Sequence, residues 1–257
     1  MNGPLLLALL VAQATAPADA VRFITCPIYR DTDAGKKSGC WLADAHESGV
    51  RYDVSLSPVK PDWNYAVLVE GAPALATPTA AITPCGGVVL DPVRVSVLPA
   101  PCPRHMLPAE GFAGRTFVLP QRNLHPLAAP RPVPAKPYAM RLFTVPFSFG
   151  SAFISYQLAD YTIDQAAAYA AAIHASKVEI TGYAATVPAT VSGETIAEPA
   201  AIARSRAEIA AEWVEREGTP ANRITLRWQN AAAPVAFEAA DGLAEPSRRR
   251  VEIRVFP

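Results

Sequence analysis

Apolar and polar residues alternate with a period of two at four places in the C-terminal half of the chain, and this period predicts β-strands. The four stretches are residues 143–149, 178–183, 223–228 and 249–255. Two helical patterns lie between them. One is an Ala-rich segment from Thr162 to about Ala175, opened by a Thr-Ile-Asp-Gln capping box, and the other runs from Pro199 to just before Gly218. The order β-α-β-α-β-β predicts a layer of two helices on one sheet.

The second helical segment carries apolar residues mostly three or four positions apart, the spacing of one buried helix face. The predicted buried stripe consists of Ile202, Ile209, Trp213 and Val214. Gly150 and Ser151 are predicted only to end the first strand. The arginines at 248–250 are interpreted as structural charges at the start of an edge strand, where charge discourages aggregation.

The N-terminal half shows a different pattern, with short runs of β-branched and aromatic residues and no amphipathic helix of useful length. The runs at 50–56, 65–70 and 88–98 are punctuated by Gly, Pro, Asn and Asp. This predicts an all-β domain over residues 21–118, either a small, partly open β-barrel of OB-like character or a short sandwich. The predicted fold class of the whole chain is therefore α+β.

Two further segments complete the predicted domain organisation. Residues 4–11 form an apolar run followed by Ala-Asp-Ala at 18–20, which is typical of a signal peptide over residues 1–20. The run is shorter than the roughly 20 apolar residues that span a bilayer, so we expect no transmembrane span in the mature chain. Residues 119–140 contain six prolines and predict a semi-rigid linker. We therefore expect residues 141–257 to fold independently.

All four cysteines of the chain precede the predicted linker, at Cys26, Cys40, Cys85 and Cys102. In an exported protein an even number of cysteines predicts disulfides, here two, because the periplasm is oxidising. Three connectivities are possible. We favour Cys26–Cys40 with Cys85–Cys102, because each of these pairs closes a short local loop.

The sequence offers no constellation for catalysis, a cofactor or a metal. Gly-x-Ser-x-Gly, His-Glu-x-x-His, a Walker loop and a dinucleotide fingerprint are all absent. No Cys-x-x-Cys occurs, and none of the four histidines lies at ligand spacing from another. The formal net charge is zero, so no bulk field favours nucleic acid or anionic lipid. We expect a protein that is not an enzyme and that binds no cofactor, metal or nucleic acid.

Three motifs in the C-terminal half occur in the order and spacing of the OmpA-like domain, the peptidoglycan-binding module of many bacterial envelope proteins. Thr181–Ala185 stands where that family has a Gly-His-Thr-Asp turn. Ile202–Ala207 stands for its Leu-Ser-x-x-Arg-Ala, and Arg248–Glu252 for its Asn-Arg-Arg-Val-Glu. Residues 141–257 therefore resemble an OmpA-like domain, which implies the β-α-β-α-β-β fold.

The resemblance also implies a binding site. In that family the Asp and the helix Arg bind the ammonium and the carboxylate of diaminopimelate in the peptidoglycan stem peptide. Arg206 keeps the arginine position, whereas Ala185 replaces the Asp and Arg248 replaces an Asn. The loop from 186 to 198 is longer than usual, and its Glu194 or Glu198 could supply the missing anion.

Arg206 also has a simpler interpretation, as a helix-surface arginine paired with Glu208 or Glu212. Arginine suits carboxylate capture, but it is also common on exposed helix faces.

Together these patterns predict a non-catalytic protein of the periplasm or cell envelope, including its outer-membrane side. It is expected to associate weakly with the peptidoglycan stem peptide. Two alternatives stay open. The OmpA-like domain could have lost peptidoglycan binding and contact another envelope protein instead, or the β domain could contain a hydrolase.

The first testable prediction is export with disulfide formation. The intact mass of the native protein should correspond to an N-terminus at Val21, and alkylation should find no free thiol among the four cysteines. A species that retains Met1, or two or more alkylatable thiols, would contradict both the compartment and the disulfide framework.

Overall fold

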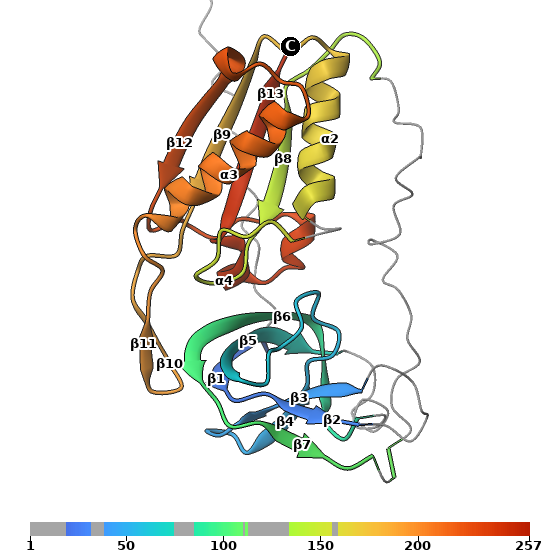
Figure 1. Ribbon diagram of the computed structural model, residues 1–257, viewed down its shortest axis with the longest axis vertical. Coiled ribbons are helices and arrows are strands. Elements are labelled where there is room, and N and C mark those ends of the chain that lie inside the picture. Colours follow the sequence, from blue (N-terminus) through green and yellow to red (C-terminus); the bar gives the residue numbers. More distant parts are fainter. Residues whose placement is uncertain (1–18, 32–38, 75–84, 110, 113–133, 156–158) are drawn as a thin grey trace, which may run out of the picture.

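The computed structural model describes residues 19–31, 39–74, 85–109, 111–112, 134–155 and 159–257. These residues form one large sheet from each half of the chain and a separate two-stranded hairpin, with the two long helices packed on the C-terminal sheet (Figure 1). Nearly all of the predicted signal peptide and most of the predicted linker lie outside the described residues, so both stay predictions. Within the described ranges, no helix has the length and apolar character needed to cross a bilayer.

The described part of the N-terminal half has strands and no helix, as its sequence predicted. Its seven-stranded sheet has the order β1-β5-β6-β4-β3-β2-β7, with antiparallel neighbours except for the parallel pairs β4–β6 and β2–β7. The strands are β1 (Val21–Thr25), β2 (Ile28–Arg30), β3 (Cys40–Ala45), β4 (Val50–Asp53), β5 (Tyr65–Pro73), β6 (Val88–Pro101) and β7 (His105–Leu107).

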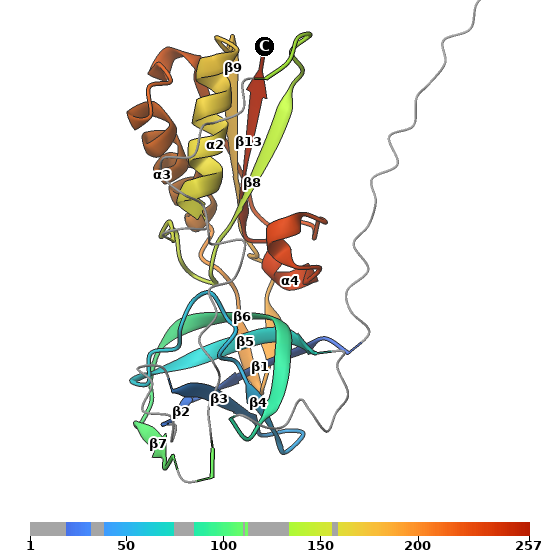
Figure 2. The ribbon, with the colours of Figure 1, turned by 90° about the vertical axis from the view of Figure 1, so that its right-hand side faces the viewer.

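This sheet curls back on itself, because β1 contacts β3 although the two strands are not neighbours in the sheet order (Figure 2). The concave side holds one apolar cluster to which five strands contribute. Within it the rings of Phe23 and Tyr52 lie 5.5 Å apart. The choice between an OB-like barrel and a sandwich stays a prediction.

Two disulfides join Cys26 to Cys102 and Cys40 to Cys85, so the connectivity that we favoured from the sequence is wrong. The Cα–Cα distances are 5.6 Å and 5.8 Å. Our preference for short loops ignored the strand order. Strand β2 pairs with both β3 and β7, which brings the chain just before β2 close to the chain just before β7. The Cys26–Cys102 disulfide therefore joins the starts of two strands that are neighbours in the sheet, and Cys40–Cys85 joins the start of β3 to the chain just before β6.

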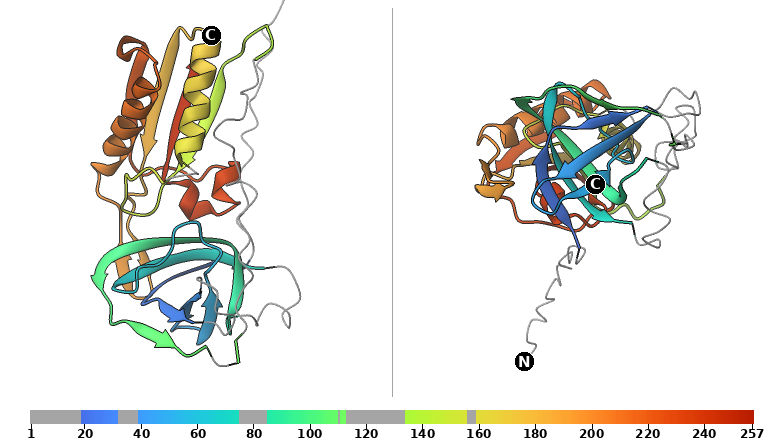
Figure 3. Two further views of the ribbon diagram at one scale, coloured as in Figure 1. Left: turned by 45° about the vertical axis from the view of Figure 1, so that its right-hand side comes forward. Right: turned by 90° about the horizontal axis from the view of Figure 1, so that it is seen from below.

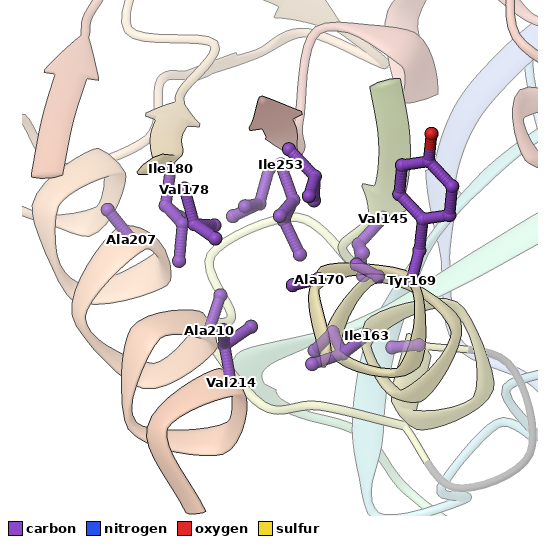
Figure 4. Packing of buried hydrophobic residues seen from close by; sticks show 14 of the residues in the cluster. Val145, Ile163, Tyr169, Ala170, Val178, Ile180, Ala207, Ala210, Val214 and Ile253 are labelled. Atoms are coloured by element: carbon purple, nitrogen blue, oxygen red, sulfur yellow. The ribbon is translucent and has the colours of Figure 1, made fainter. Parts of the chain in front are cut away.

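The C-terminal sheet has four strands in the order β12-β9-β13-β8, with two helices against one face (Figures 1 and 2). Its elements are β8 (Arg141–Pro146), α2 (Ala159–Ala172), β9 (Lys177–Tyr183), α3 (Ile202–Arg216), β12 (Ile224–Gln229) and β13 (Arg250–Phe256). Between sheet and helices lies a core that includes Val145, Ile163, Ile180, Val214 and Ile253 (Figure 4). The predicted β-α-β-α-β-β order is confirmed.

Helix α3 approaches β9 closely at Gly182. A Cβ atom at this position would lie 1.9 Å from the carbonyl oxygen of Ala203, which is far inside contact distance. Alanines at 203, 207 and 210 face the sheet from the helix and are fully buried. Small residues on both sides therefore set the distance between α3 and the sheet, and this distance fixes where the arginine on that face can reach.

Several boundaries differ from the predicted ones. Helix α2 begins at Ala159, three residues before Thr162, so Thr162 is not an N-cap. The carbonyl of Ser155 instead accepts the first backbone N–H bonds of the helix, from residues 159 and 160. Helix α3 begins at Ile202, after Pro199. Ile209 and Trp213 are only partly buried, because Arg206 and three alanines share the inner face with Ile202 and Val214.

The predicted loop between β9 and α3 contains a β-hairpin, β10 (Ala189–Val191) and β11 (Glu194–Ile196). Its two-residue turn, Ser192-Gly193, has positive φ angles of 49° and 77°, as type I′ turns require. Short helical turns η2 (Ala221–Arg223), η3 (Glu238–Ala240) and α4 (Ala244–Ser247) complete the C-terminal half. The last of these, α4, lies at the junction of the two sheets (Figure 3).

The two halves of the chain are joined by a buried ion pair. Arg249, only 1% exposed, donates from Nη2 to Oε2 of Glu70 at 2.5 Å and from Nη1 to Oε1 at 3.2 Å. Glu70 lies on β5 and also accepts from Nε of Arg22 at 3.1 Å. The buried carboxylate of Glu70 thus accepts hydrogen bonds from one arginine of each half, Arg22 and Arg249.

Other hydrogen bonds cross the same junction. They are Ile24 N to Ser192 Oγ at 3.0 Å, Phe149 N to Ser96 Oγ at 2.8 Å, and Arg94 Nη2 to Asp241 Oδ2 at 2.6 Å. Independent folding of residues 141–257 stays untested. These contacts give a physical reason for the fragment to be less stable than the whole chain.

We predict that Glu70→Ala lowers the free energy of unfolding by about 3–5 kcal/mol, because it leaves the guanidinium of Arg249 buried without its carboxylate. Urea unfolding of the full chain measures this value. The matched control is Glu208→Ala, which breaks the exposed pair with Arg204 on α3 and should leave the unfolding midpoint nearly unchanged. Equal midpoints for Glu70→Ala and the wild type would show that the pair does not hold the halves together.

Candidate functional site

Arg206 lies on the inner face of α3, and its side chain is completely buried. The flanking residues on this face, Ala203 and Ala207, are too small to separate it from the sheet. Its guanidinium carbon lies 5.3 Å from the ring centre of Phe147, just after β8. The interpretation as a surface arginine is wrong. Glu208 and Glu212 instead pair with Arg204 and Arg216, on the exposed side of the helix.

Every N–H of the Arg206 guanidinium has a partner in the same chain. Nε donates to the carbonyl of Ser151 at 2.9 Å. Nη1 donates to the carbonyl of Tyr183 at 2.8 Å and to Oε2 of Glu198 at 3.0 Å, and Nη2 donates to the carbonyl of Ser148 at 3.1 Å and to Oε1 of Glu198 at 2.5 Å. An arginine side chain has five N–H donors, so none is left for a ligand.

Glu198 is as deeply buried as its partner, with a side chain that is 0% exposed. Besides the two bonds from Arg206, its carboxylate accepts backbone N–H bonds from Gly150 and Ala185, each at 2.8 Å. Burial by itself would raise the pKa of Glu198. The bonds and charge of Arg206, together with the two backbone donors, outweigh burial and hold that pKa below its ordinary value. The carboxylate is therefore ionised at neutral pH.

Of the two acids proposed for the long loop, the structure brings only Glu198 to Arg206. Glu194 begins β11 next to the hairpin turn and is exposed. The hairpin ends just before Glu198, and the backbone N–H of Glu198 bonds to the carbonyl of Ala185 at 3.1 Å. After the β10–β11 hairpin the chain therefore returns to the end of β9, where the carboxylate of Glu198 faces Arg206.

Ala185 and Arg248 line a cavity of about 260 Å³ beside this ion pair. The Ala185 side chain supplies no charge, and its backbone N–H is already bonded to Glu198. Arg248 donates from Nε to Oε1 of Glu245 at 2.9 Å and from Nη1 to the carbonyl of Ala232 at 2.7 Å. Arg206 does not line the cavity. The predicted site residues therefore divide between a closed ion pair and an adjacent open cavity.

The arginines after position 248 do not lie on an edge strand, because β13 is between β9 and β8. Arg250 is buried, donates to Oε1 of Glu252 at 2.8 Å and lies 3.9 Å above the ring centre of Tyr183. Their predicted structural role fits these contacts. The predicted reason, that charges on an edge strand discourage aggregation, was wrong. The guanidinium groups of Arg249 and Arg250 are buried and pair with glutamates.

Sequence reasoning missed the turn after β8, which contributes two carbonyls and one backbone N–H to the pair. Ser148 was predicted to lie in the strand 143–149, and Gly150 and Ser151 only to end it. The available signal was Gly150, which takes φ 68° and allows this turn to fold over the arginine. Arg22 and Glu245, which also line the cavity, were missed because they belong to distant parts of the chain. Within the described ranges, no three His, Cys, Asp or Glu side chains are grouped to hold a metal.

Comparison with solved structures gives similar domains in bacterial envelope proteins. One is the OmpA-like domain of FopA1 from Francisella tularensis (17% identity, 46% of this chain, 73% of that chain, TM-score 0.37). Another is the type VI secretion system cell wall anchor from Pseudomonas aeruginosa (25% identity, 46% of this chain, 81% of that chain, TM-score 0.34). A third is the peptidoglycan-associated lipoprotein from Burkholderia pseudomallei (18% identity, 44% of this chain, 89% of that chain, TM-score 0.34). No protein-family model and no curated sequence matches the chain.

These matches cover slightly less than half of this chain. All three TM-scores are below 0.5. The functional proposal therefore depends on the residues of this chain.

We predict that Glu198→Ala lowers the free energy of unfolding by about 3–5 kcal/mol, because it strands a fully buried guanidinium. Glu198→Gln should cost less, since its amide oxygen still accepts from Arg206. Glu194→Ala, an exposed acid of the same loop, is the control and should have little effect. Urea unfolding at neutral pH gives all three values, and equal losses for the substitutions at 194 and 198 would contradict the assigned pair.

The pH dependence provides an independent check of the same pair. Because the folded state lowers the pKa of Glu198 from its ordinary value of 4.5, this residue stabilises the protein fully above that value. The contribution is lost as the pH falls through the lower pKa of the folded state. The stability difference between wild type and Glu198→Gln should therefore narrow below about pH 4.5. A stability difference between the two proteins that stays constant down to pH 3 would contradict the lowered pKa of Glu198.

Proposed function

We propose that this chain is a non-catalytic protein of the cell envelope whose OmpA-like domain is an interaction module with weak affinity for the peptidoglycan stem peptide. The observation that carries the proposal is the complete intramolecular occupation of Arg206. A ligand carboxylate needs this guanidinium, and Glu198 already accepts from it at 3.0 Å and 2.5 Å. The domain keeps the arginine of the OmpA-like motif and pairs it with its own carboxylate.

Two separate features weaken recognition of diaminopimelate. Ala185 offers no anion to the ligand's ammonium, and a net hydrogen bond to a charged group contributes about 1.5–3 kcal/mol, or roughly 10- to 150-fold in affinity. In addition, the ligand carboxylate would have to displace Glu198 and leave this acid without Arg206. Peptidoglycan is nevertheless the partner to test, because the sequence motifs resemble those of OmpA-like domains.

The envelope location is supported by the covalent structure. The two disulfides fit an oxidising compartment and the predicted signal peptide over residues 1–20. Two of the similar solved structures are named as a cell wall anchor and a peptidoglycan-associated lipoprotein. An alternative within the same location is a module that contacts another envelope protein and has lost peptidoglycan binding entirely. The closed Arg206 pair favours either form over tight peptidoglycan binding.

We propose the same domain limits as those expected from the sequence: a signal peptide at 1–20, a β domain at 21–118, a linker at 119–140 and the OmpA-like domain at 141–257. For the β domain we propose an OB-like, partly open barrel. Support comes from the contact between β1 and β3 and from the apolar cluster to which five strands of the curled sheet contribute.

We predict that the wild-type chain binds a diaminopimelate-containing stem peptide weakly, and that Ala185→Asp combined with Glu198→Ala tightens binding by at least about 10-fold. The double variant frees Arg206 and supplies the anion for the ligand's ammonium. Ala185→Asp alone should gain less, because Glu198 still occupies the arginine. Isothermal titration of the full chain gives the affinities, and circular dichroism checks that each variant is folded.

Glu194→Ala is the matched control, since it removes an exposed acid of the same loop without touching Arg206. Tight wild-type binding that is insensitive to the substitutions at 185 and 198 would overturn the proposal. No detectable binding by either the wild type or the folded double variant would favour the module that contacts another envelope protein.

A further inference from the structure

The cavity beside Ala185 lies at the junction of the two halves of the chain. Its lining residues come from strand β1, the β10–β11 hairpin, the α4 segment and adjoining loops. Figures 1 and 3 show where these elements lie. Its volume is about 260 Å³, which is room for a small organic molecule. The apolar part of its wall includes Phe149, Val187 and Ile196. The only charged side chains among its lining residues are Arg22, Arg248 and Glu245.

The two arginines of the cavity share one carboxylate. Glu245 accepts from Nε of Arg248 at 2.9 Å, and its other oxygen lies 3.6 Å from Nη1 of Arg22. Arg22 also donates to Glu70. The charge of Glu70 is already balanced by its buried partner Arg249. Three arginines and two glutamates therefore form this cluster, which leaves one positive charge without a counter-charge.

Donors for an anion are also available. Nη2 of Arg22 and Nη2 of Arg248 make no hydrogen bond to any residue that the structure describes. Their side chains are 21% and 29% exposed, so a molecule in the cavity can reach them. This situation is opposite to that of Arg206, whose donors are all used within the chain.

We propose that this cavity binds a small monocarboxylate, free or at the end of a peptide, through Arg22 and Arg248. Guanidinium groups bind carboxylates through paired, charge-assisted hydrogen bonds. A single excess positive charge matches one carboxylate better than a dianion such as phosphate. Phe149, Val187 and Ile196 would hold a small apolar group attached to that carboxylate, as apolar walls do in small-molecule sites.

The proposed ligand differs from the one implied by the resemblance to OmpA-like domains. There an Asp at position 185 would hold an ammonium, whereas here the same wall is neutral and faces two cations. One cation comes from β1 in the N-terminal sheet and the other from the residue that follows α4. The site therefore requires both halves of the chain, and it does not depend on peptidoglycan binding.

The experiment titrates the full-length chain with N-acetylalanine, with its neutral analogue N-acetylalaninamide and with inorganic phosphate, followed by amide chemical shifts. We expect the acid to bind in the millimolar range, with shifts around Ala185 and Ala232, and the neutral amide to bind at least about 10-fold more weakly. Arg248→Gln should weaken binding of the acid about 10-fold, because it removes the charge and the fork. Arg204→Gln, on the exposed side of α3, is the matched control and should change nothing.

Ala185→Asp separates this proposal from the one about Arg206. A new carboxylate in the cavity should abolish binding of N-acetylalanine, whereas it can only help the diaminopimelate peptide. Equal binding of the acid and the neutral amide, or unchanged binding in folded Arg248→Gln, would overturn the proposal. Phosphate binding tighter than the acid would overturn the monocarboxylate assignment. Tighter acid binding in Glu198→Gln together with unchanged binding in Arg248→Gln would place the ligand at Arg206 and also overturn the proposal.

Discussion

A fully buried arginine needs a complete set of acceptors, and this requirement organises the C-terminal half of the protein. The guanidinium of Arg206 draws together the turn after β8, the end of β9 and the segment that follows the hairpin. Each contributes a carbonyl or a carboxylate, since an unpaired charge in this position would cost several kcal/mol. The small residues between α3 and β9 bring the helix close enough for the arginine to reach these acceptors. The arginine that the OmpA-like motif implies as a ligand-binding residue therefore has a structural role in this chain.

The hairpin insertion links that pair to the N-terminal sheet. Its turn residue Ser192 accepts from the backbone of Ile24 on β1, and Val191 joins an apolar cluster with Ile24 and Leu68. Two residues after the end of β11, Glu198 pairs with Arg206. On the other side of the junction Arg249 reaches Glu70. The position of the Glu198 carboxylate beside Arg206 is thus set partly by contacts made by the other half of the chain.

The sequence predicted the features that depend on local periodicity and left open those that depend on long-range contact. The strands, the two main helices and the all-β N-terminal half follow from alternation and spacing. The buried face of α3 was predicted from apolar residues alone, so Arg206 was missed there and Trp213 was included. The disulfide partners depend on strand order, and the shortest loops proved a poor guide.

For the site, the motif identified Arg206 and the missing Asp, and the choice of acid narrowed to Glu194 or Glu198. Only the path of the hairpin separates the two acids, because their distance from Arg206 along the sequence differs by four residues. The turn at Ser148–Ser151 and the residues Arg22 and Glu245 carry no motif. They become part of the site through the packing of the two halves, which no local pattern contains.

An internal carboxylate has a kinetic and thermodynamic advantage that a free ligand must overcome. Even a flexible tether gives an effective concentration in the millimolar range, and a side chain held by backbone N–H bonds from Gly150 and Ala185 exceeds that value. A ligand that offers the same carboxylate geometry and nothing more therefore loses to Glu198. It can bind only by adding contacts elsewhere, and the open cavity beside Ala185 is where this chain leaves cationic donors and apolar surface to make them. In our proposal, the cationic donors available to a ligand therefore lie in the cavity formed by both halves and not on Arg206 of α3.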